Sequence, residues 1–133
     1  MSSGGAFSWN SELPSGRSPA WVRDEGLAGL GLHAGDAVSV DSRAEPSDGD
    51  LVVAEIEVNG DSQRITRRYR DLGEGRVRLE PVGAPLPPDI QPLALNLESV
   101  ILMGVIRGRV RIQDGGARIL EEPLTNASVD PAT

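Results

Sequence analysis

The stretch GLHAGDAVSVDSRAEPSDGDLVVAEIE, residues 31–57, decides the fold class of this chain. It contains two runs rich in valine and other apolar residues, 37–40 and 51–58, each preceded by a turn of glycine and aspartate. Valine and isoleucine suit a pleated, half-buried strand, whereas Gly, Pro, Asp and Ser favour turns. The stretch therefore predicts two β-strands, arranged as a hairpin or meander.

The following residues continue this β pattern. The Asn-Gly pair at 59–60 is a strong signal for a two-residue hairpin turn. Residues 63–70 then alternate, which places Arg67 on the same face as Ile65 and Tyr69. Further strands are expected at 76–81, at 100–112 (as one strand or two) and, as a short edge strand, at 117–121.

The composition agrees with a turn-rich β protein. The chain has 133 residues, 16 glycines and 10 prolines, which suits one β domain better than a helical bundle. Its aromatic residues are Phe7, Trp9, Trp21 and Tyr69, so the core must consist of valine, leucine and isoleucine. Cysteine is absent, which excludes disulfides and cysteine-based metal sites and is compatible with a reducing compartment.

The expected domain organisation has three parts. Residues 1–19 are rich in Ser, Gly and Pro and read as a flexible N-terminal arm, although Phe7 and Trp9 leave open that the arm docks as an extended strand. Residues 20–121 form the β domain, and residues 122–133 form a disordered tail.

The charge of the chain limits the kinds of partner it can bind, and its apolar runs indicate where it is located. The net charge is −7, and all 13 cationic residues are arginine. This balance disfavours direct binding to nucleic acid, since phosphate contacts need a basic surface. The apolar run 100–106 is too short to span a membrane, and no secretory signal is recognisable at the N-terminus. A cytoplasmic protein is expected.

Two motifs within the opening stretch resemble a known family. GDAVSVD at 35–41 and DGDLVVA at 48–54 resemble the catalytic-domain signature of LexA-like and UmuD-like self-cleaving serine peptidases. Residues 66–69, Thr-Arg-Arg-Tyr, match the family's VKRL motif, which precedes a VxLxP strand as it does here. The resemblance implies a mainly β fold of twisted antiparallel sheets that form a partly open barrel.

The catalytic residues of that family are replaced in this chain. Its reaction uses a serine activated by a neutral lysine. Counting back from Gly35 without gaps places Gly26 on the serine, and the VKRL match places Arg67 on the lysine. Glycine has no nucleophile, and a guanidinium stays protonated at working pH. The resemblance therefore implies a domain that is not an enzyme, with vestigial positions at Gly26 and Arg67 and no cofactor.

Arg67 needs a partner if it lies on the apolar face of its strand, because an unpaired buried guanidinium is costly. We expect it to pair with a carboxylate in the former active-site loop, either Asp24 or Glu25. The alternative is a strand slipped by one residue, with Arg68 directed inward.

The resemblance also implies a function. The chain has no helix-turn-helix ahead of the domain, so it resembles the stand-alone UmuD type, whose processed form binds a translesion DNA polymerase. It implies a homodimeric regulatory or partner-binding module in DNA repair or transcription regulation, within the DNA-damage (SOS) response. Dimers of that family pair their C-terminal strands, and the corresponding residues here are Ile101, Met103, Val105, Ile106, Val110 and Ile112.

Two other functions stay open. One is an active serine hydrolase with an unorthodox dyad built on Ser39, Ser42 or Ser47. The other is a nucleic-acid-binding module that uses the arginine-rich strands, with Arg64, Arg68, Arg70, Arg76 and Arg78. The single histidine, His33, is interpreted as a surface residue. Three aspartates with side chains of the type that binds metal ions are interpreted as turn formers, namely Asp36, Asp48 and Asp50.

Overall fold

The structure, a computed structural model, describes residues 10–11, 13–83, 92–113, 115 and 118–124. Strands dominate, so the expected mainly β fold is confirmed. The strands are β1 (Asn10–Ser11), β2 (Arg17–Trp21), β3 (Ala37–Asp41), β4 (Leu51–Val58), β5 (Asp61–Gly73), β6 (Arg76–Glu80), β7 (Leu93–Asn96), β8 (Ile101–Gln113) and β9 (Arg118–Glu122). Two short 3-10 helices are η1 (Ala28–Leu30) and η2 (Leu97–Ser99).

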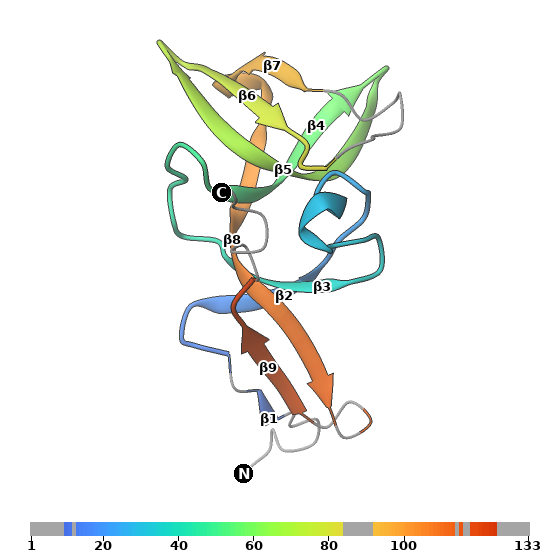
Figure 1. Cartoon of the computed structure of the whole chain (residues 1–133). Coiled ribbons are helices and arrows are strands. Elements are labelled where there is room, and N and C mark those ends of the chain that lie inside the picture. Colours follow the sequence, from blue (N-terminus) through green and yellow to red (C-terminus); the bar gives the residue numbers. More distant parts are fainter. Residues whose placement is uncertain (1–9, 12, 84–91, 114, 116–117, 125–133) are drawn as a thin grey trace.

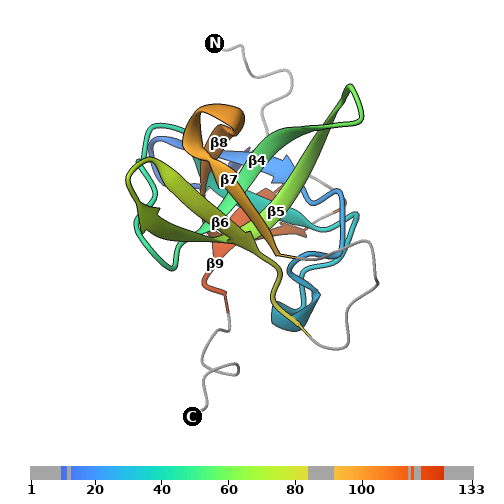
Figure 2. The ribbon, with the colours of Figure 1, turned by 90° about the horizontal axis from the view of Figure 1, so that it is seen from above.

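The described strands belong to one nine-stranded sheet with the path β1-β9-β8-β4-β5-β6-β7, and β3 pairs with both β2 and β8. Every pairing is antiparallel except that of β1 with β9. Figure 1 shows β4 to β7 at one end of the molecule and the ribbon of β8 and β9 at the other. Seen from above, β4 to β7 curl around each other (Figure 2), but the strand path does not close into a barrel.

The long strand β8 connects the two ends of the molecule. Val105 pairs with Val52 of β4 and with Asp41 of β3, and Arg109 pairs with both β3 and β9. Because a strand residue has one neighbour on each side, β4 and β9 lie along one edge of β8 and β3 lies along the other. β8 is thus one continuous strand, and it forms the centre of the sheet.

The position of β8 corrects one expectation. The strands at residues 37–41 and 51–58 exist as expected, but they do not pair as a hairpin, because they lie on opposite edges of β8. The connection 42–50 is long and contains its own turn, in which Asp50 N donates to the carbonyl oxygen of Ser47 at 2.9 Å. Such a connection does not impose the pairing that a two-residue hairpin turn imposes.

The hairpin expected around residues 59–60 is confirmed. Asn59 and Gly60 have φ angles of 53° and 87°, and they join β4 to β5, which pair over the whole length of β4. Positive φ at both central residues is the mark of a type I′ turn, whose twist matches that of the strands.

The core is aliphatic, as the composition predicts, and lies in two main clusters. One contains the loop residues Leu27 and Leu32 packed on Val38 and Ile106. The other lies inside the curl of β4 to β7 and β8 and includes Tyr69, the one aromatic side chain in either cluster of the described residues. The first cluster holds the loop between β2 and β3 in place, which positions the site described below.

The folded part begins earlier than expected. The boundary between arm and domain, expected at residues 19–20, falls inside β2, which pairs with β3 along its whole length. β1 also joins the sheet, through β9. Phe7, Trp9 and residues 125–133 lie outside the described residues, so the expectations for the first part of the arm and for most of the tail stay predictions. Among the described residues, none of the helices has the length and apolar character needed to cross a membrane.

Candidate functional site at Gly26 and Arg67

The site is built by the loop between β2 and β3. Val22 N donates to the carbonyl oxygen of Asp36 at 2.8 Å, and Gly35 N donates to the carbonyl oxygen of Val22 at 2.9 Å, so the two ends of the loop are joined. Leu27 and Leu32 within it are fully buried. The apolar side chains therefore anchor the loop on the sheet and leave its polar residues in a fixed position.

The same loop is also bound to the segment after β6. Val82 N donates to the carbonyl oxygen of Gly26 at 2.7 Å, and Gly29 N donates to the carbonyl oxygen of Val82 at 2.7 Å. A Cβ atom on Gly29 would lie 2.5 Å from Cα of Gly83, so a residue without a side chain is needed at this close approach. These contacts join the loop to the segment that follows β6.

Arg67 of β5 points into this loop and pairs with Asp24. Its Nη1 lies 2.7 Å from Oδ2 of Asp24 and also donates to the carbonyl oxygen of Thr66 at 2.7 Å. The other carboxylate oxygen of Asp24 accepts hydrogen bonds from Thr66 Oγ1 at 3.1 Å and from Gly26 N at 3.2 Å. The Arg67 side chain is only 5% exposed, whereas that of Asp24 is 22% exposed. The pair is thus buried on the arginine side and reaches water on the carboxylate side.

Gly26 lies directly against Arg67. A Cβ atom built on Gly26 would overlap with Nη1 of Arg67 and with the carbonyl oxygen of Thr66. The two positions that the motifs place on the nucleophile and the base are therefore in contact, although they are far apart in the sequence. The guanidinium occupies the space that a side chain at position 26 would need.

Glu25, the other expected partner of Arg67, takes a different role. Its carboxylate contacts Nδ1 of His33 at 2.7 Å and accepts a hydrogen bond from Ala34 N at 2.8 Å. The backbone hydrogen bond from Ala34, and secondly the hydrogen bond from His33, lower the pKa of Glu25. His33 itself lies at the surface, as expected, with its side chain 58% exposed.

The strand register with Arg67 inward is the one that the structure has. Arg67 is 4% exposed, whereas Arg68 is only half-buried, so the slipped alternative is wrong. Thr66 at the site was not predicted, because strict alternation directs it away from Arg67. Thr66 is nevertheless buried, and its hydroxyl donates to the same carboxylate of Asp24 that pairs with Arg67.

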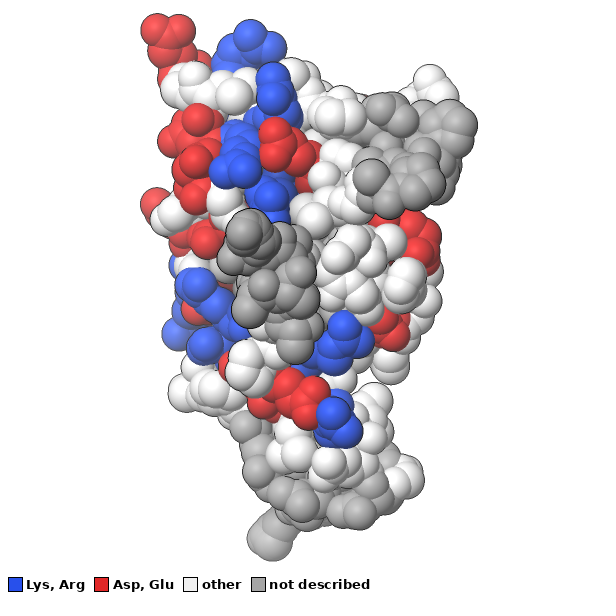
Figure 3. Space-filling model, in the orientation of Figure 1, with Lys and Arg blue, Asp and Glu red and all other residues white. Residues whose placement is uncertain are grey.

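The other arginines of β5 and β6 are largely paired with carboxylates. Arg64 contacts Glu55 at 3.3 Å, Arg70 contacts Glu80 at 3.0 Å, and Arg78 contacts the same glutamate at 3.5 Å. Figure 3 shows the blue and red residues interspersed on this face of the molecule. Such a mixed surface offers phosphate groups little net positive charge.

The serines and aspartates singled out in the sequence have structural contacts. Ser39 is buried and donates to Glu121 Oε1 at 2.5 Å, whereas Ser42 and Ser47 are exposed. Three aspartate carboxylates accept backbone N–H bonds at turns or strand ends, from His33 to Asp36, from Ser47 to Asp50 and from Asp71 to Asp48. In the described part of the chain, no group of three or more His, Asp or Glu residues is arranged to hold a metal ion.

The residues expected on a dimer strand all lie in β8, but they differ in exposure. Val105, Ile106 and Val110 are buried within the chain, and Met103 is half-buried. Ile101 and Ile112, at the two ends of the strand, are 63% and 48% exposed. Since β4, β3 and β9 occupy much of both edges of β8, pairing with another chain is restricted to the parts of its edges that these strands leave open.

No family model matches the chain, and no curated protein sequence matches it significantly.

Proposed function

We propose that this chain is a catalytically inactive LexA/UmuD-like domain that acts as a dimeric regulatory or partner-binding module. The observation that carries this proposal is the contact between Gly26 and Arg67. The motifs assign these positions to the nucleophile and the base of a peptidase dyad, and such a dyad requires two residues that touch. A wrong motif alignment would be expected to select two positions that lie apart in the fold, whereas Gly26 and Arg67 are in contact.

The same contact explains why the site would not cleave peptides. Glycine offers no nucleophile, and the guanidinium of Arg67 is held by Asp24 at 2.7 Å and cannot act as a base. The ion pair and the hydrogen bonds from Thr66 and Gly26 to Asp24 tie the loop to β5. In this proposal the former catalytic pair has become a structural contact.

The dimer that we propose uses the C-terminal half of β8. β3 ends its pairing with β8 at Arg109, whereas β9 continues along the opposite edge as far as Gln113. In the described part of the chain, the edge of residues 110–113 opposite β9 therefore has no strand partner. An open edge with the exposed Ile112 beside it suits antiparallel pairing with the same strand of a second copy. A protein partner in the DNA-damage response is the further role that the resemblance suggests.

Self-cleavage is tested by the mass of the intact protein. The purified chain is held at alkaline pH, where a lysine-type base would be neutral, and its mass is then measured. We expect the full mass of 14.1 kDa to persist. A truncated product that forms at a rate independent of protein concentration would show an active site within the chain and would overturn the proposal. This outcome also covers the alternative dyad built on Ser39, Ser42 or Ser47.

The dimer is tested by size-exclusion chromatography with light scattering. We expect the wild-type chain to be a dimer and Ile112→Lys to be a monomer, because lysine places a charge at the proposed pairing edge. Ile101→Lys is the matched control, since it changes an exposed isoleucine at the other end of the same strand. A monomeric wild-type chain would overturn the dimer, and a dimer that withstands Ile112→Lys would overturn the assigned edge.

A further inference from the structure

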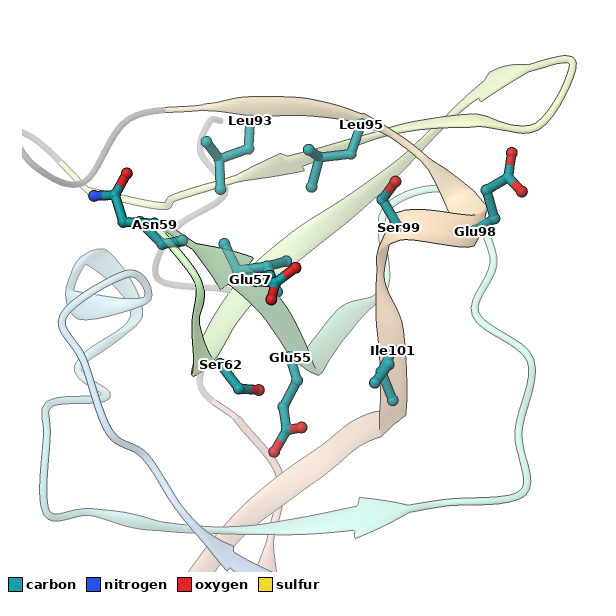
Figure 4. A pocket seen from close by; sticks show the side chains of 11 residues that line it. Glu55, Glu57, Asn59, Ser62, Leu93, Leu95, Glu98, Ser99 and Ile101 are labelled. Carbon is teal, nitrogen blue, oxygen red and sulfur yellow. The ribbon is translucent and has the colours of Figure 1, made fainter.

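A pocket of about 840 Å³ lies between β4, β7, η2 and the start of β8. Figure 4 shows Leu93 and Leu95 directed from β7 into the pocket, with Glu57 below them and Glu98 and Ser99 at one end. None of its lining residues belongs to the contacts of Gly26 and Arg67. Its volume is in the range of pockets that bind ligands.

Two strand edges border this pocket. β8 pairs with β4 only from Val52 to Glu55, so the last residues of β4, 56–58, have no neighbour on that side among the described strands. β7 is the last strand of the sheet path and pairs with β6 alone in the described part of the chain. The pocket is thus the gap where the curled sheet fails to close. Open strand edges present unpaired N–H and C=O groups that can pair with an added strand.

The side chains at the gap separate into an apolar and an acidic face. Ile56 belongs to the core cluster inside the curl, and Val58, Leu93 and Leu95 pack against that cluster. Along β4 the alternate residues Glu55 and Glu57 point to the other face. An extended segment inserted here would therefore meet apolar side chains on one face and carboxylates on the other.

The carboxylates at the gap are not all neutralised by the described residues. Glu55 pairs with Arg64 at 3.3 Å. In contrast, Glu57 and Glu98 are exposed and take part in no ion pair with the described residues. Ile101 at the same pocket is 63% exposed. Negative charge beside exposed apolar surface indicates a partner that carries both positive charge and apolar side chains.

We propose that this gap binds an extended segment of a partner protein in which apolar and cationic residues alternate, and that the segment adds a strand to the edge of β4 or β7. Its apolar residues would pack on Ile56, Val58, Leu93 and Leu95, and its cationic residues would face Glu57 and Glu98. This inference deepens the proposed partner-binding function and rests on it. It does not depend on the loss of catalysis at Gly26.

The test uses a short capped peptide in which arginine and valine alternate, labelled for fluorescence polarisation and titrated with the full chain at low salt. We expect saturable binding that weakens as salt is added, because the carboxylates at the rim are exposed. The double variant Glu57→Gln with Glu98→Gln should weaken binding about three- to tenfold, as expected for the loss of two surface charge pairs. The matched control is Glu45→Gln with Glu74→Gln, which removes two exposed carboxylates outside the pocket and should leave binding unchanged.

A second peptide tests the strand pairing itself. Methylation of alternate backbone nitrogens keeps the side chains but removes the N–H donors that an added strand needs, so we expect it to abolish binding. The proposal is overturned if the unmodified peptide does not bind saturably, if the methylated peptide binds equally well, or if both double variants lose the same affinity. The proposed function is tested by the mass and the oligomeric state of the protein, which do not depend on these titrations. A failure of the proposed function can therefore be distinguished from a failure of the peptide-binding proposal.

Discussion

Asp24 and Arg67 form an ion pair in which Oδ2 of the aspartate lies 2.7 Å from Nη1 of an arginine side chain that is only 5% exposed. Asp24 belongs to the loop between β2 and β3, and Arg67 belongs to β5, so the pair joins two parts of the fold that are distant in sequence. The contact also fills the space next to Gly26.

Loss of the charge of Asp24 should destabilise the protein strongly. Asp24→Asn leaves the guanidinium of Arg67 buried without a counter-charge. We expect this to lower the free energy of unfolding by about 3 kcal/mol. Asp48→Asn is the matched control, because its pair with Arg70 spans 3.5 Å and its side chain is 59% exposed, so its loss should cost less than about 1 kcal/mol. Urea denaturation measures both. Equal costs for the two variants would show that the Arg67 pair is no stronger than a surface contact.

A methyl group at position 26 should also be destabilising. Gly26→Ala places Cβ against Arg67 and against the backbone of Thr66, and overpacking of this kind costs about 1–3 kcal/mol. Gly75→Ala serves as a control, since its Cβ meets nothing and it bears only the cost of a φ of 76°, about 1 kcal/mol. Thermal unfolding compares them. If Gly26→Ala proved as stable as wild type, the close approach of the loop to β5 would be wrong.

The contact of Glu25 with Ala34 and His33 should make stability depend on pH in the acid range. These contacts lower the pKa of Glu25 below its ordinary value of 4.5. A carboxylate with a lowered pKa in the folded state stabilises the protein above its unfolded pKa, and this contribution is lost as pH falls through the folded pKa. The difference in melting temperature between wild type and Glu25→Gln should therefore be largest near neutral pH and vanish in acid. A difference that grows as pH falls would contradict the assigned contact.

A side chain at Gly104 should disturb the pairing of β8 with β3. A Cβ atom there would overlap with the side chain of Val40 and lie 2.9 Å from the carbonyl oxygen of Asp41. Gly104→Ala should cost about 1–3 kcal/mol, because the neighbouring backbone must move. Hydrogen exchange of the amides of β3 would locate the effect, with faster exchange expected in β3 than in the β4–β5 hairpin. Uniform destabilisation of both regions would argue against a local clash.

The strands could largely be predicted from the sequence, because their signals are local. The alternation around residues 63–70, the Asn59-Gly60 turn and the apolar runs depend only on which residues follow one another, and the structure has strands and a turn there. The pairing of β3 and β4 could not be predicted. Both strands pair with β8, and the choice of partner depends on contacts between distant segments that no local signal records.

The candidate site could likewise be predicted only in part from the sequence. The apolar alternation and the cost of an unpaired guanidinium were enough to expect a carboxylate opposite Arg67. They did not distinguish Asp24 from Glu25, because both lie in one loop whose backbone path the sequence leaves open. That path is set by hydrogen bonds to Val82 and by the burial of Leu27, and it turns Glu25 toward His33 instead.

The order of residues along the chain was sufficient to determine a β protein with an aliphatic core and an arginine in need of a partner, since each of these follows from side-chain chemistry over a few neighbouring positions. The tertiary structure alone decided that Asp24 and not Glu25 pairs with Arg67, that β8 lies at the centre of the sheet, and that a gap remains between β4 and β7. These features depend on how segments distant in the sequence pack and exclude water from one another. The free energy of that packing depends on the complete fold and not on neighbouring positions in the chain.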